Sequence, residues 1–144
     1  MAYKTTDIAN KILAKGTASG DLISNLKLQK LLYYMQGVFL AYFDKQLFED
    51  DIEAWMYGPV VPSIYHLYKD KGNLGIEYDK EVITLNSTQE ENLFDEVFRI
   101  YSRFSATGLM EMTHNESPWK SVKTGVGNII SPEIMKQFFK KRIK

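Results

Sequence analysis

The feature that most constrains this chain is a run of apolar residues at helical spacing between Ser24 and Phe43. Apolar side chains return every three or four positions, which is the period of a helix with one buried face. Ser24 precedes the run and is a favourable N-cap residue. The apolar stripe consists of Leu28, Leu31, Leu32, Met35, Val38, Phe39 and Tyr42. We therefore expect a central core helix ending near residue 43, with this stripe buried.

Shorter helices are expected before and after this core helix. Gly16 is a plausible end for the first of them, which leaves residues 17–21 as a loop. The other helix starts are marked by a capping residue or by a proline at the first turn. These starts are Thr6 and Asp7, Pro62, Ser87, Ser105 and Ser131. The sequence therefore predicts a mainly α fold.

Two short segments favour β-strands. Residues 52–56 alternate between apolar and polar types, and residues 81–85 are rich in Val, Ile and Thr. Gly58 and Pro59 interrupt the first segment, so residues 81–85 are its expected partner. Two strands are marginal unless helices cover them. We expect a small two-stranded antiparallel β element in a compact helical fold, with residues 1–144 forming a single domain.

Composition narrows the classes of function. The absence of cysteine excludes disulfides, thiol nucleophiles and thiolate zinc sites. The 18 basic and 18 acidic residues give a net charge of zero, which argues against a nucleic-acid binder. The polar N-terminus does not resemble a signal peptide, and the longest apolar stretch is too short to span a bilayer. We expect a cytoplasmic protein that does not bind membranes.

No catalytic constellation is evident in the sequence. A phosphate-binding loop and a nucleophile elbow are both absent, and His66 and His114 lie far apart. Residues 49–53 are acidic but lack the glycine turn of a calcium loop, and the basic residues after Lys136 are typical of a helix end. We therefore expect no catalytic residue, metal ion or cofactor, although a hydrolase that uses one of the histidines stays an alternative.

Two neighbouring features are candidates for binding a protein partner. The first is a rigid turn with aromatic residues, which can anchor an interface at a small entropic cost. The second is one face of the core helix, where basic and tyrosine side chains flank the apolar stripe. The predicted partner-binding residues are Lys27, Lys30, Tyr34, Trp55, Tyr57, Gly58 and Pro59. The alternative interpretation is a solvated helix edge beside aromatic residues that close the core.

Several motifs, taken together, resemble the SocA-like Panacea antitoxin domain, a family that also includes the GepA-type phage-associated proteins. The matches keep the family order over nearly the whole chain. They comprise Leu26-Lys27-Leu28-Gln29-Lys30-Leu31-Leu32-Tyr33-Tyr34, Leu47-Phe48, Ile52-Glu53-Ala54-Trp55, Tyr57-Gly58-Pro59-Val60, Tyr65, Thr113-His114, Pro118-Trp119 and Ile130-Ser131.

The resemblance implies a bacterial or prophage-encoded antitoxin that is not an enzyme. Its expected partner is a toxin encoded next to it, which it would neutralise by direct binding. One branch of the family implies a link to a cytoplasmic protease. The alternative function is a phage or mobile-element regulatory protein that contacts nucleic acid or acts as a protease adaptor.

Overall fold

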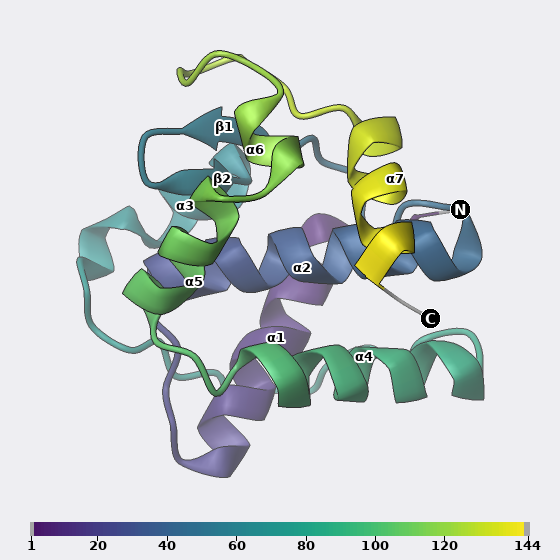
Figure 1. Cartoon of the computed structure of the whole chain (residues 1–144). Coiled ribbons are helices and arrows are strands. Elements are labelled where there is room, and N and C mark those ends of the chain that lie inside the picture. Colours follow the sequence, from purple (N-terminus) through teal and green to yellow (C-terminus); the bar gives the residue numbers. More distant parts are fainter. Residues whose placement is uncertain (1, 143–144) are drawn as a thin grey trace.

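The computed structural model describes residues 2–142 and is organised around helix α2 (Asn25–Phe43). The other elements surround this helix, which crosses the centre of the molecule in Figure 1. The Ser24 side chain accepts a hydrogen bond from the Lys27 backbone N–H at 3.3 Å, as its role of N-cap requires. Asp44 ends the helix in the left-handed region, with φ at 58°. The predicted core helix is therefore confirmed at both ends.

Helix α2 is covered on nearly all sides. It contacts α1 (Thr5–Ser19), α4 (Thr88–Tyr101), α5 (Ala106–His114) and α7 (Pro132–Arg142), and α4 runs below it in Figure 1. Gly37 is required where α7 crosses, because an added Cβ would lie 2.1 Å from the Phe139 ring. The predicted stripe is buried except at Tyr42, which is 49% exposed near the end of the helix.

The remaining helices are short. They are α3 (Pro62–Tyr68), the 3₁₀ turn η1 (Lys69–Lys71) and α6 (Ser117–Lys120). The expected caps at Ser87 and Ser105 are confirmed, since their side chains accept hydrogen bonds from backbone N–H groups at 3.1 and 3.0 Å. Ser131 likewise accepts from the Glu133 N–H at 3.1 Å.

Helix α1 differs from the prediction at both of its ends. It begins at Thr5 without a side-chain cap, and it continues past Gly16 to Ser19. Gly16 lies inside the helix, where its missing side chain leaves room for Ile23: an added Cβ would lie 2.7 Å from the Ile23 Cδ1 atom. Gly20, with φ at 78°, is the residue that stops α1.

The small sheet is antiparallel, but its second strand is not the predicted one. Strand β1 (Glu53–Trp55) pairs with β2 (Gly58–Val60), which follows directly after a tight turn. The opposite edge of β1 is bonded to residues 125–130, including an Ala54 N–H to Asn128 oxygen bond of 3.0 Å. Both edges of β1 are therefore occupied, and the prediction that residues 81–85 pair with it was wrong.

Residues 81–85 instead form a segment without regular secondary structure, which side chains hold in place. The Lys11 ammonium donates to the Ile83 carbonyl at 2.7 Å, and the Leu85 N–H donates to the Glu91 carboxylate at 2.6 Å. Among the helices of residues 2–142, none is long and apolar enough to cross a membrane.

Candidate functional site

The first half of α2 carries polar side chains that hold distant segments in place. The Gln29 side chain accepts a hydrogen bond from the Val61 N–H at 2.8 Å and donates to the Asn25 side chain at 2.9 Å. Asn25 in turn donates to the Tyr65 carbonyl at 3.1 Å. Because these bonds are mostly buried, they fix the start of α3 and the end of the hairpin against α2.

Lys30, one of the predicted partner-binding residues, lies in the interior and not at an accessible surface. Its side chain is 0% exposed, and its ammonium donates to the Pro59 carbonyl at 2.9 Å. Burial lowers the pKa of Lys30 to about 7. Gly58 makes room for this side chain, since an added Cβ would lie 2.7 Å from the Lys30 Cε atom, and its φ of 108° also favours glycine.

Tyr34, another of the predicted partner-binding residues, is also buried and not accessible to a partner. Tyr33 and Tyr34 donate to the two carboxylate oxygens of Glu116, each at 2.9 Å. The Tyr34 ring stacks on Tyr101 with centroids 4.0 Å apart. Burial raises the pKa of both tyrosines and of Glu116, because each charged form loses its hydration.

Glu116 is a residue that sequence reasoning missed. It precedes Ser117 and Pro118 at a helix start, where an acidic side chain is ordinarily solvated. Its hydroxyl partners lie 83 and 82 residues earlier in the chain. No local pattern therefore points to this buried carboxylate.

The turn between β1 and β2 is fixed by residues near the end of α5 and in α6. Trp119 donates its indole N–H to the Trp55 carbonyl at 2.8 Å, and His114 Nε2 lies 3.1 Å from the Met56 carbonyl. A carbonyl only accepts, so His114 is the donor. The His114 and Trp119 rings stack with centroids 4.2 Å apart. These two residues therefore anchor two consecutive carbonyls of the turn.

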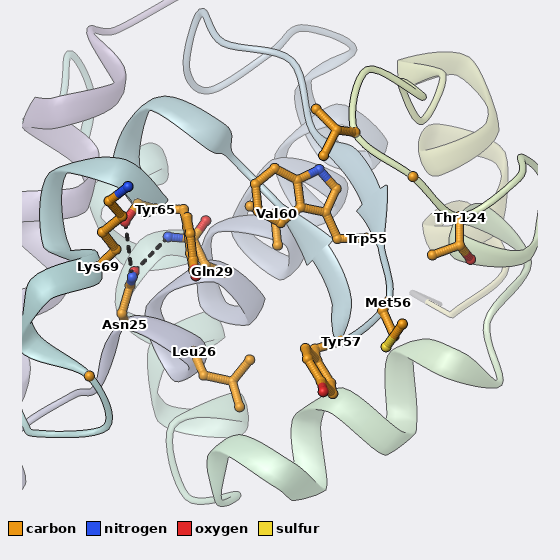
Figure 2. Close-up of a pocket in the computed structure, with 13 residues that line it drawn as sticks. Asn25, Leu26, Gln29, Trp55, Met56, Tyr57, Val60, Tyr65, Lys69 and Thr124 are labelled. Carbon is orange, nitrogen blue, oxygen red and sulfur yellow. Dashed lines mark hydrogen bonds between the residues drawn. The ribbon is translucent and has the colours of Figure 1, made fainter.

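Beside this turn lies an open cavity of about 800 Å³, drawn in Figure 2. Its walls come from α2, the hairpin, the α3–η1 segment and the loop at 124–126. The lining residues are Asn25, Leu26, Gln29, Trp55, Met56, Tyr57, Val60, Tyr65, Lys69, Gly72, Thr124, Gly125 and Val126. A volume of this size is within the range of ligand-binding pockets.

The cavity brings together only part of the predicted binding set. Trp55 and Tyr57 line it. Pro59 does not, and its carbonyl accepts a hydrogen bond from the buried Lys30. Lys27 is half-buried and donates to the Ser102 carbonyl at 2.5 Å, and it is not among the lining residues.

The described residues offer little for metal binding. Within residues 2–142, no group of three or more His, Cys, Asp or Glu side chains is arranged to hold a metal ion. The Glu53 carboxylate accepts hydrogen bonds from the Trp55 indole N–H at 2.9 Å and the Gly127 N–H at 2.8 Å. Glu53 therefore acts as a structural bridge between β1 and the loop that follows α6.

Comparison with known proteins identifies the family of this chain. The model of the antitoxin SocA-like Panacea domain matches residues 28–120. The chain belongs to this family. The match includes Lys30, the hairpin, Glu116 and Trp119, so much of the buried polar framework of this Panacea domain falls within the family region. The chain is also similar to antitoxin SocA of Caulobacter vibrioides (strain NA1000 / CB15N).

The similarity to the Caulobacter protein spans most of both chains. The two are 32% identical over 132 residues, which cover 83% of this chain and 70% of the relative. No solved structure matches this Panacea chain. This family membership supports an antitoxin role for the chain.

Proposed function

We propose that this chain neutralises a toxin, encoded by a neighbouring gene, by binding it directly in the cytoplasm. The observation that carries the proposal is membership of the SocA-like antitoxin family over residues 28–120. A direct contact is supported by the open apolar cavity beside a rigid hairpin turn, because rigid aromatic anchors lose little entropy on binding. The net charge of zero favours a protein partner over nucleic acid.

The proposed contact surface is centred on the tip of the hairpin. Met56 and Tyr57 are 67% and 61% exposed. Burial of these large side chains against a partner would be favourable. The backbone that presents them is held by Trp119 and His114. An exposed aromatic side chain on a fixed backbone has the properties of a binding hot spot.

The first test is co-expression with the product of the adjacent reading frame. We expect that product alone to stop growth of the host, and we expect this chain to restore growth and to co-purify with it as a stable complex. Growth rescue without a complex of the purified proteins would count against direct neutralisation and in favour of an indirect route such as proteolysis.

The contact surface is tested by Tyr57→Asp. A charge at a buried hot spot should weaken binding of the neighbouring product by at least about 2 kcal/mol. Because Tyr57 is exposed in the free chain, the thermal midpoint should stay close to that of the unsubstituted protein. Isothermal titration calorimetry and differential scanning calorimetry measure the two effects.

Tyr42→Asp is the matched control for this substitution. Tyr42 is 49% exposed near the far end of α2 and does not line the cavity. We expect it to bind the neighbouring product with unchanged affinity. Equal losses at Tyr42 and Tyr57, or no loss at Tyr57, would rule out the hairpin tip as the contact surface.

A further inference from the structure

The shape of the cavity favours an apolar occupant. Trp55 and Tyr65 form one wall with their rings edge to face and centroids 5.2 Å apart, and Leu26 is half-buried among the other lining residues. Binding of an apolar side chain to such walls is favourable, because it displaces water from their apolar surface. The walls are also fixed before any ligand arrives, since Asn25, Gln29 and the turn are all hydrogen-bonded.

The cavity has one charged residue among its thirteen lining residues, which is Lys69. Lys69 is exposed, and it takes part in none of the ion pairs found among residues 2–142. The amides of Asn25 and Gln29 already bond to each other and to the backbone. The charge complementary to this apolar cavity is therefore a single negative group placed near Lys69.

The surroundings of the cavity suit a polypeptide better than a small metabolite. The apolar surface extends over the rim, where Met56, Tyr57 and Val126 are 67%, 61% and 82% exposed. A small ligand buried in the cavity would leave these side chains in water, whereas a protein surface can cover them. Exposed apolar side chains gathered around one depression are typical of protein interaction sites.

We infer that this cavity receives an apolar side chain from a segment of the toxin that also carries an aspartate or glutamate, with Lys69 contacting that carboxylate. The inference rests on the proposed function and specifies the chemistry of the partner at the same site. The apolar side chain provides most of the buried area, and the Lys69 contact fixes the orientation of the segment.

The experiment measures binding of the purified neighbouring gene product to two cavity variants. Leu26→Trp fills the cavity with a larger side chain, and Lys69→Glu places a like charge opposite the expected carboxylate. Leu26 lies outside the core cluster and Lys69 is exposed, so both variants should keep the thermal midpoint. We expect each to weaken binding by about tenfold or more.

Leu74→Trp and Lys71→Glu are the matched controls. Leu74 is 67% exposed, Lys71 is exposed in the same 3₁₀ turn as Lys69, and neither lines the cavity. Both controls should bind with unchanged affinity. If the unsubstituted chain binds the product and the two cavity variants bind equally well, the inference is wrong while the proposed function stands. If the unsubstituted chain does not bind, both fail.

A charge exchange tests the carboxylate itself. The Asp and Glu residues of the neighbouring product are changed to Lys one at a time. Each variant product is then titrated with the Lys69→Glu chain. We expect one of these changes to restore most of the lost affinity, because it recreates the opposite pairing. Absence of rescue at every position would overturn the anchoring role of Lys69. Self-association of the chain that is abolished by Leu26→Trp would overturn the toxin segment as the occupant.

Discussion

We expect Glu116→Ala to lower the free energy of unfolding by about 2–6 kcal/mol, because it leaves two buried tyrosine hydroxyls without acceptors at about 1–3 kcal/mol each. Tyr33 and Tyr34 are both 0% exposed, so water cannot easily replace the carboxylate. Both hydroxyls donate to Glu116 at 2.9 Å. Urea unfolding followed by circular dichroism at neutral pH measures the loss.

Two comparisons separate this effect from a general cost of losing a glutamate. Glu133→Ala removes an exposed carboxylate whose partner is Gln137 one helical turn away, and it should cost less than about 0.5 kcal/mol. The triple variant Tyr33→Phe, Tyr34→Phe, Glu116→Leu replaces all three polar groups with apolar ones and should be more stable than Glu116→Ala. A Glu116→Ala cost no larger than that of Glu133→Ala would contradict the role of this network.

The parts of the fold that could be predicted are those with local causes. Ser24 caps α2 through a bond to a residue three positions later, and Ser87 and Ser105 cap their helices in the same way. The apolar stripe of α2 also follows from residue spacing within one element. Such signals lie within a few residues of one another, so they can be read without knowing the tertiary structure.

The environment of Lys30 and Tyr34 could not be predicted for the opposite reason. Helical periodicity indicates which side of α2 is the most apolar, but it does not indicate whether the other side is also covered. The covering groups are the Pro59 carbonyl and the Glu116 carboxylate, which lie 29 and 82 residues away from their partners. For this reason the sequence could not distinguish the buried Lys30 and Tyr34 from residues at a solvated helix edge.

The strand pairing was wrong because the sequence signals for turns are ambiguous. Gly58 and Pro59 are typical of a break, yet here they form the beginning of β2 opposite Ala54 and Trp55. Pro59 is tolerated because its ladder partner Ala54 directs its own N–H and carbonyl to Asn128 and Gly125, so β1 needs no backbone donor from Pro59. Residues 81–85 have high β-propensity but meet side chains of α1 and α4 rather than a strand.

The candidate site was predicted in part. Trp55 and Tyr57 were identified from a rigid aromatic turn, and both line the cavity. The cavity is completed by Tyr65, Lys69 and the loop at 124–126, which reach the turn only through tertiary contacts. The Gly125 N–H, for example, donates to the Ala54 carbonyl at 2.8 Å. A cavity with walls from four separate segments has no signature in any one of them.

Lys30 makes the stability of the folded chain depend on pH in a mildly alkaline window. Its pKa is about 7 in the folded state because of burial, against about 10.4 in an unfolded chain. Between these values the unfolded state binds a proton that the folded state does not. The free energy of unfolding therefore rises with pH across this window, and this contribution is lost as pH falls toward 7.

We expect the free energy of unfolding to increase by about 2 kcal/mol between pH 7 and pH 9, since the slope approaches about 1.4 kcal/mol per pH unit above the folded pKa. Lys30→Met cannot bind the proton and should lose this increase, although it also leaves the Pro59 carbonyl without its donor. Lys71→Met removes an exposed lysine and should keep the increase. Urea unfolding at several pH values measures all three slopes. An equal slope in Lys30→Met and the unsubstituted chain would show that Lys30 stays protonated across this window, and that its burial is offset by contacts stronger than the single bond to Pro59.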